Sequence, residues 1–347
     1  MGSPWDDPAA SWLRALAESV HADPSGELRI TPTRSGALIA VLPELVVKVH
    51  QPRLDDGLLA ARVGLAASTD LAPWVLAPLR PDPVALPPEV ALALGGPWRR
   101  ASLWPRVHVL DPDQAELPWA TAGRLLAGLH RSGVPQGAPV NGSAERLDRA
   151  LTRLAGLDGP DAAAVRAAGM AVAEDLAHES PGLGALVHGD WHLGQLGRLG
   201  AVGQLGVEGQ LGIEGWRLID VDDLGTGPPA LDLARPAGFW AAGLVPDAAW
   251  VAFLEAYRGA GGPGVPSAGD PWPALDPYAR AAVVVAAARV LAEQDPGGSR
   301  GGPADTTGPA LVGACRRMPP AVGSRRGTHG AHRGVVLGET THVKESR

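Results

Sequence analysis

The sequence predicts an α+β protein with a small antiparallel N-terminal lobe, residues 1–104, and a larger, mainly helical C-terminal lobe, residues 105–318. Two observations lead to this prediction. Short runs of branched apolar residues, separated by Pro and Gly, are typical of strands and occupy most of the first part. After Pro105, apolar residues recur at helical spacing. A chain of 347 residues is long enough to bury a core in each lobe.

The N-terminal lobe is expected to begin with an amphipathic helix over residues 8–22, which places Trp12, Leu13, Leu16 and Val20 on one face. Five strand-like stretches follow, the last two forming a pair around the turn Gly95-Gly96-Pro97. They cover residues 28–31, 37–42, 45–49, 90–94 and 101–104.

The C-terminal lobe is expected to contain six helices, because each segment carries a stripe of apolar residues at helical spacing. They cover residues 119–131, 144–157, 161–178, 247–258, 277–293 and 311–318. The tail, residues 319–347, is rich in Gly, Arg and His and has few large apolar residues, so we expect it to be disordered.

Composition and charge narrow the classes of function. The net charge of −7 speaks against a general nucleic-acid binder. The single cysteine, Cys315, allows no intrachain disulfide and no cysteine-based zinc site. The first residues are acidic where a signal peptide needs basic ones, and the longest apolar run, 281–292, is too short to span a bilayer. We expect a soluble, cytoplasmic protein with no membrane partner, no nucleic-acid partner and no evident protein partner.

The segment from Leu186 to Asp223 contains the tetrapeptide Gly-Gln-Leu-Gly three times. An apolar piece precedes the copies and another follows them, and both end in polar clusters, which predicts a loop followed by a hairpin. The hairpin would bring Asp190, Gln195 and Asp220 close together. Their carboxylate and amide oxygens are hard ligands suited to Mg²⁺.

The spacing in this segment is typical of a phosphoryl-transfer site. Protein kinases place a catalytic Asp and a metal-binding Asn five positions apart, and a later Asp holds the Mg²⁺ that bridges the nucleotide phosphates. Here Gln195 stands at the matching position after His188-Gly189-Asp190, and Asp220 follows. Upstream, Lys48 in Val-Val-Lys-Val stands where a strand lysine grips phosphates.

Four motifs in order resemble those of the aminoglycoside phosphotransferase family. His-Gly-Asp-Trp-His-Leu-Gly-Gln at 188–195 resembles its catalytic signature, and the Gln in place of Asn is closer to the maltokinase and glucosamine kinase branches. The others are Leu-His at 129–130, Leu-Ile-Asp at 218–220 and Pro-Ala-Leu-Asp-Leu-Ala at 229–234. The likeness extends over residues 30 to 295.

The resemblance implies a bilobal, protein-kinase-like fold. It also implies transfer of the γ-phosphoryl group of ATP to a hydroxyl of a small-molecule acceptor: a sugar, an amino sugar or an aminoglycoside. It further implies that Asp190 is the catalytic base, that Gln195 and Asp220 are Mg²⁺ ligands and that Lys48 binds phosphate.

The resemblance also gives supporting roles to four further residues. His188 and His192 would brace the catalytic loop, and Asp232 would support it from the Asp-Leu-Ala segment. Asp222 would either assist the metal or face the acceptor.

The chain departs from the kinase pattern at two points. The phosphate-covering turn Thr-Pro-Thr-Arg-Ser-Gly, residues 31–36, has only one glycine, so Gly-x-Gly-x-x-Gly is absent. The strand lysine of kinases pairs with a glutamate on the next helix, whereas residues 53–70 contain no Glu and offer Asp55, Asp56 and Arg62. Either an Asp substitutes, or the pair is absent. The absence favours a second hypothesis, a non-catalytic pseudokinase that binds nucleotide or a partner. A third is a metal-dependent hydrolase built on His188, Asp190 and His192.

The position relative to Asp190 indicates which copy of Gly-Gln-Leu-Gly belongs to the catalytic motif. The first contains Gln195, whereas the copies at Gly203 and Gly209 fall within a Gly-rich hairpin insertion, residues 198–215. Loop entropy rises slowly with length, so lengthening a surface turn costs little stability. Deleting residues 201–212 should therefore leave ATP turnover nearly intact, and loss of activity with a preserved fold would refute this.

Overall fold

The computed structural model describes residues 7–33, 36–111, 114, 116–178, 184–200, 213–293 and 306–319. Two of our predictions therefore lie outside the described residues: the deletion of residues 201–212, and the disordered tail beyond Pro319.

The N-terminal part is built on a five-stranded sheet in the order β1-β2-β3-β5-β4, with every neighbouring pair antiparallel. Its strands are β1 (Arg29–Pro32), β2 (Leu38–Val41), β3 (Leu45–Val49), β4 (Val84–Ala85) and β5 (Arg100–Pro105). Ala40, Val47 and Leu103 from this sheet pack in one buried cluster with Leu13 of α1 (Pro8–Ser19). The second helix, α2 (Asp56–Ala66), follows β3.

The strand expected at 90–94 is wrong. These residues belong to α3 (Pro88–Ala93) and its C-terminal end. Prolines are favoured at the first position of a helix, and Pro88 occupies the start of this one. A short apolar run does not separate strand from helix by its composition, and here Val90 is buried while Leu92 is 81% exposed. The partner of β5 at this edge is β4.

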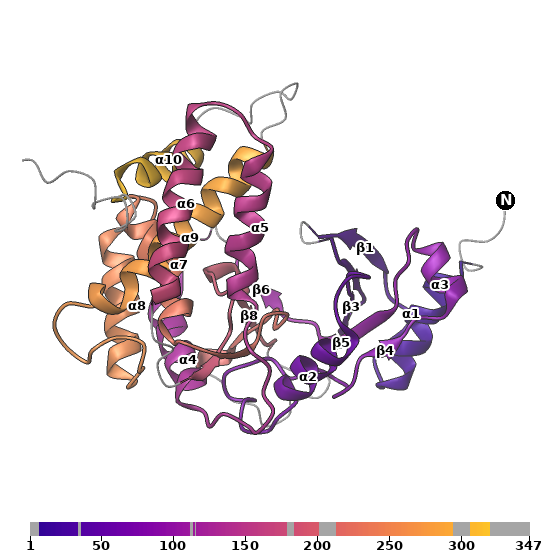
Figure 1. Cartoon of the computed structure of the whole chain (residues 1–347). Helices are drawn as coiled ribbons and strands as arrows, with labels where there is room; N and C mark the ends of the chain where they lie inside the picture. Colours follow the sequence, from indigo (N-terminus) through magenta and orange to yellow (C-terminus); the bar gives the residue numbers. More distant parts are fainter. Residues whose placement is uncertain are drawn as a thin grey trace, which may run out of the picture.

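The C-terminal part is mainly helical (Figure 1). All six expected helices are present, and a seventh, α7, encloses the Asp-Leu-Ala segment. They are α4 (Trp119–Arg131), α5 (Ser143–Ala155), α6 (Pro160–His178), α7 (Ala230–Ala241), α8 (Asp247–Gly259), α9 (Trp272–Glu293) and α10 (Thr307–Arg317). None of the helices among the described residues is long and apolar enough to cross a membrane.

The expected hairpin is present and positions the polar clusters. β8 (Leu196–Arg198) pairs antiparallel with β9 (Trp216–Leu218), and β6 (His108–Val109) lies on the other edge of β8. β7 (Ala185–Val187) pairs with β10 (Gly225–Gly227). The ends of β7 and β9 thus lead into the segments that carry the predicted site residues.

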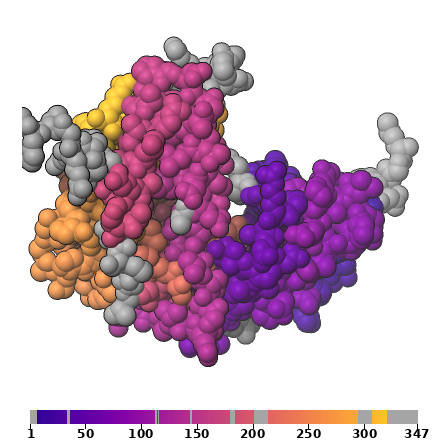
Figure 2. Space-filling model, viewed as in Figure 1, coloured from indigo at the N-terminus to yellow at the C-terminus, as the bar shows by residue number. Residues whose placement is uncertain are grey.

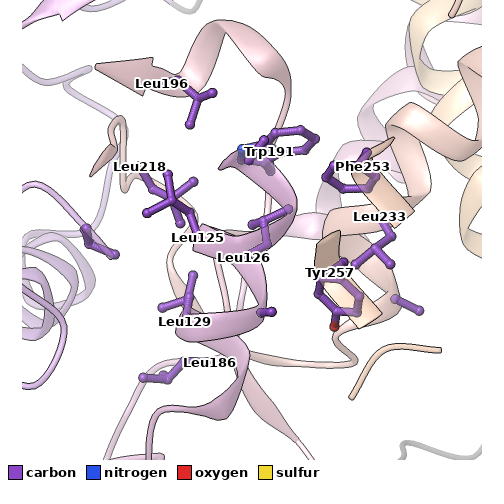
Figure 3. Packing of buried hydrophobic residues seen from close by; sticks show 14 of the residues in the cluster. Leu125, Leu126, Leu129, Leu186, Trp191, Leu196, Leu218, Leu233, Phe253 and Tyr257 are labelled. Carbon is purple, nitrogen blue, oxygen red and sulfur yellow. The ribbon is translucent and has the colours of Figure 1, made fainter. Parts of the chain in front are cut away.

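The segment after β7 is anchored in the helical core. Trp191 is buried and stacks on Phe253 of α8, with ring centroids 5.3 Å apart and an interplanar angle of 11°. Figure 3 shows Trp191 and Phe253 side by side, with Leu125 and Leu126 of α4 beneath them. An α+β architecture with an antiparallel N-terminal sheet and a helical remainder is therefore confirmed. The boundary at residue 104 stays a prediction.

Candidate active site

Lys48 links the N-terminal sheet to the segment after β9. It lies on β3, the middle strand of the sheet, and its ammonium group contacts Asp220 and lies 2.6 Å from the Oδ2 of Asp222. The Lys48 residue is 8% exposed, so burial alone would disfavour its charge. The two carboxylates outweigh burial and raise the pKa of Lys48 above its ordinary value. Lys48 is therefore not a lysine on an edge strand that extends toward solvent.

The pairing of Lys48 answers the question raised by the missing glutamate. Asp55 accepts a hydrogen bond from the backbone N–H of Leu58 and caps α2. Asp56 lies 3.0 Å from Arg100 on β5. Neither reaches Lys48, so the second carboxylate beside this lysine comes from Asp222, not from the helix that follows the strand.

Gln195 and Asp220 meet as the hairpin predicts. The side-chain amide of Gln195 donates to Asp220 at 3.0 Å, and the backbone N–H of Ile219 donates to the carbonyl of Gln195. Burial opposes ionisation of Asp220, but Lys48 and the hydrogen bond from Gln195 lower its pKa to about 2. Asp220 has a φ of 63°, which is uncommon for a residue with a side chain and is characteristic of functional sites.

A buried hydrogen-bond network holds the backbone of the catalytic-loop signature. Asp232 on α7 accepts from the backbone N–H groups of His188, at 2.6 Å, and Gly189, at 2.8 Å. His130 at the end of α4 donates to the same carboxylate at 2.9 Å, and its other ring nitrogen lies 2.8 Å from the Tyr257 hydroxyl. Three donors around one carboxylate hold the loop in place and connect the end of α4 to α7.

The two histidines of the signature use ring nitrogens to hold the loop itself. The Nε2 of His188 lies 2.7 Å from the carbonyl of Ile219. The Nδ1 of His192 accepts from the Gly194 amide at 3.1 Å. Burial lowers the pKa of His192 to about 3, so its ring is neutral at physiological pH. Among the described residues, no group of three or more His, Cys, Asp or Glu side chains is arranged to hold a metal ion.

Asp190 has an arginine neighbour that sequence reasoning missed. Arg146 on α5 contacts the carbonyl of Gly189 and the carboxylate of Asp223, and its Nε lies 3.7 Å from Asp190. Asp190 keeps 45% of its side chain exposed and is therefore accessible from outside the loop. No local pattern around Arg146 signals this contact, because it depends on how α5 packs.

Gly189 is required by the close approach of two backbone segments. Its φ is +86°, and a Cβ at this position would lie 2.5 Å from the carbonyl oxygen of Asp223. A side chain here would push the catalytic loop away from the segment after β9. The molecular surface is hollowed where the N-terminal residues meet α5 (Figure 2).

The side chains present fit a divalent cation. Asp220 is ionised, and the donation by the Gln195 amide nitrogen leaves the carbonyl oxygen of that side chain available as a ligand. Mg²⁺ is commonly bound by one or two protein oxygens together with substrate phosphates, which matches this small donor set. Lys48 adds a positive charge beside it.

Comparison with known proteins shows the fold. No family model matches the chain, and no curated protein matches it by sequence. Among solved structures, it is similar to a microcompartment-associated aminopropanol kinase, with a TM-score of 0.55 and 16% identity over 88% of this chain and 94% of that one. It is also similar to a spectinomycin phosphotransferase in complex with ADP and spectinomycin, with a TM-score of 0.54 and 14% identity over 88% and 97% of the two chains.

A third similar structure is an amicoumacin kinase in complex with AMP-PNP and Ca²⁺, with a TM-score of 0.53 and 13% identity over 85% of both chains. The chain thus has the fold of the aminoglycoside phosphotransferases and related small-molecule kinases, which confirms the expected kinase-like architecture.

Proposed function

We propose that this protein is an ATP-dependent phosphotransferase that moves the γ-phosphoryl group to a hydroxyl of a small molecule. The observation that carries the proposal is the convergence of Lys48, Gln195 and Asp220 beside the Asp190 loop. Three proteins of this fold, each described as a kinase or phosphotransferase, give it further support.

Each side chain has a role that its position allows. Asp190, a partly exposed carboxyl group, accepts the proton of the attacking acceptor hydroxyl and orients it. Lys48 binds nucleotide phosphate oxygens, with Asp222 holding its ammonium group in place. Gln195 and Asp220 would hold Mg²⁺, which when bound neutralises charge on the phosphates. Asp232, His130 and His188 keep the loop in position, and positioning supplies most of the rate in this class of reaction.

The proposal is tested by Mg-ATP consumption in a coupled ADP-release assay. The acceptor panel spans glucosamine, maltose, other sugars, aminoglycosides and choline-like alcohols, and the control is Asp190→Asn. Acceptor-stimulated ADP release that disappears in the control is the expected result. Tight ATP binding without release on any acceptor would favour the pseudokinase, and metal-dependent turnover without ATP would favour the hydrolase.

A further inference from the structure

A small pocket adjoins the Asp190 loop on the side of α7. It has a volume of about 210 Å³, and its walls include Trp119, His192, Arg235 and Phe239. Trp191, which follows Asp190 directly, is also part of the lining. Sites for drug-sized ligands run from roughly 300 to 1,000 Å³, so this pocket suits a monosaccharide-sized molecule or one ring of a larger one.

Arg235 is a positive charge with no ion-pair partner in the described part of the chain. Its guanidinium lies over the ring of Phe239, 5.4 Å from the centroid, and within the described residues it makes no hydrogen bond or ion pair. The side chain is partly buried, and burial lowers the pKa of Arg235 despite the opposing charge of Asp190. A partly desolvated guanidinium with unpaired donors gains more from binding an anion than a fully exposed arginine does.

His192, which also lines the pocket, presents a hydrogen-bond donor as well. Because the Nδ1 of His192 accepts from the Gly194 amide and the ring is neutral, its proton lies on Nε2. No described residue accepts a hydrogen bond from that nitrogen. No carboxylate is found among the residues that line the pocket. The lining thus offers positive charge and N–H donors, and aromatic surface besides.

The neighbouring arginines do not share this character. Arg146 is paired with Asp223, and Arg289 is paired with Glu293 at 2.9 Å. Both add positive potential near Arg235, but their donors are in use. The protein as a whole carries a charge of −7 and repels anions, so attraction of an anion to this pocket must be local.

We propose that Arg235 binds an anionic group of the phosphoryl acceptor, which makes the acceptor a hydroxylated acid of monosaccharide size. The proposal rests on the kinase function above. The acceptor hydroxyl would lie at Asp190, its anionic group at Arg235 and its apolar face on Trp119. A carboxylate matches the planar fork of the guanidinium with two parallel hydrogen bonds, and a phosphate monoester offers the same chemistry. A polycationic aminoglycoside is disfavoured by the same charge.

The test compares acids with matched neutral molecules, first without nucleotide. Calorimetry and thermal unfolding would be run with glucuronate against glucose, galacturonate against galactose, and glucose 6-phosphate, with glucosamine as the cationic probe. At least one acid should bind at least about tenfold more tightly than its neutral partner and raise the unfolding temperature with concentration. The carboxylate and phosphate arms then identify the anion.

Variants tie the binding to this residue. Arg235→Gln should lose the preference for the acid, and Arg235→Lys should retain part of it because the charge stays while the fork is lost. Arg153→Gln removes an exposed arginine of α5 that lies outside the pocket and should bind like the wild type. If Arg235→Gln does not fold, Arg235→Lys and the wild-type pairs decide.

The proposal is overturned if no acid binds better than its neutral partner, or if Arg235→Gln binds the acid as tightly as the wild type does. ADP release is then measured with the same panel, which separates the two proposals. Acid binding without any ADP release would refute the kinase and leave the anion site standing. ADP release with neutral or cationic acceptors alone would refute the anion site and leave the kinase standing.

Discussion

The two sides of the catalytic loop differ in how their charges are balanced. Toward the N-terminal sheet, Lys48 is matched by Asp220 and Asp222, and each of these carboxylates has an opposite charge within reach. Toward α7, Arg235 forms no ion pair among the described residues and faces a pocket with no carboxylate in its lining. The first arrangement holds itself together before any ligand arrives, whereas the second is completed by a ligand. We propose that the phosphoryl-transfer chemistry takes place on the first side of the loop and that the acceptor is selected on the second.

Asp232 holds the loop that lies between the two sides, so its replacement should have the largest effect. Asp232→Ala leaves three buried donors without an acceptor, and breaking a buried charged network typically costs about 3–5 kcal/mol. The free energy of unfolding is measured by urea denaturation. The control is Asp161→Asn, which breaks an exposed ion pair with Arg316 and should cost at most about 1 kcal/mol. Equal losses in the two variants would contradict the bracing role.

Asp220→Ala should impair ligand binding on one side of the loop and leave binding on the other side unchanged. Outer-shell partners of metal sites are worth about 10–100-fold in affinity, so a direct ligand should cost about 100-fold or more in Mg-ATP binding. Binding of the acid probe at Arg235 should be unchanged, because that pocket uses none of the same groups. Calorimetry with each ligand alone checks both statements. A variant that keeps Mg-ATP affinity would remove Asp220 from the metal site.

Each side contains a histidine whose pKa is lowered by desolvation, and the two together predict a loss of stability in acid. Burial lowers the pKa of His50, on the sheet side, to about 4 and that of His192, on the pocket side, to about 3. Both residues take up a proton in the unfolded chain below about pH 6.5 but stay neutral in the folded one. The free energy of unfolding should therefore fall as pH drops from 6.5 toward 4.

The size of this effect is about 2 kcal/mol per histidine at most between pH 6.5 and 5. Urea denaturation at a series of pH values measures it. His50→Asn and His192→Asn should each flatten the dependence by about one proton. A stability that stays level over this range would show that neither histidine is held neutral.

Arg146→Gln should have the smallest effect. The variant loses the contacts of α5 with Gly189 and Asp223, but Asp232 still braces the loop. Small misplacements of catalytic groups cost up to about 100-fold, so we expect about tenfold in kcat with little change in the KM for ATP. Arg149→Gln, which breaks an exposed pair three residues further along α5, is the control. A larger change in KM than in kcat would argue against a positioning role.

The sequence was informative where a contact follows from strand pairing. Lys48 on a strand, and Gln195 beside Asp220 across the hairpin, could be predicted because antiparallel pairing brings known positions together. The helices could be predicted equally well, from the helical spacing of their apolar residues. The run at 90–94 was misassigned, because an apolar stretch this short suits either a strand or a helix.

Other contacts depend on how whole helices pack. Arg146 lies on a helix whose apolar stripe does not indicate which loop the helix will contact. The second carboxylate beside Lys48 comes from Asp222 and not from the next helix. The position of Arg235 in a pocket depends on the residues that pack around it, so the sequence alone could not predict it. Tertiary packing determines which of these side chains meet, and it leaves no periodic pattern in the local sequence.

The most direct test follows the phosphoryl group itself. Wild-type protein and Asp190→Asn would be incubated with Mg²⁺, ATP labelled in the γ-phosphoryl group and the acceptor panel, and the labelled products separated. We predict a labelled phosphomonoester of the acceptor with the wild type and none with Asp190→Asn, while both bind ATP equally. Label that appears only as inorganic phosphate, or a phosphomonoester formed equally by both proteins, would contradict the assignment of Asp190 and of the kinase function built on it.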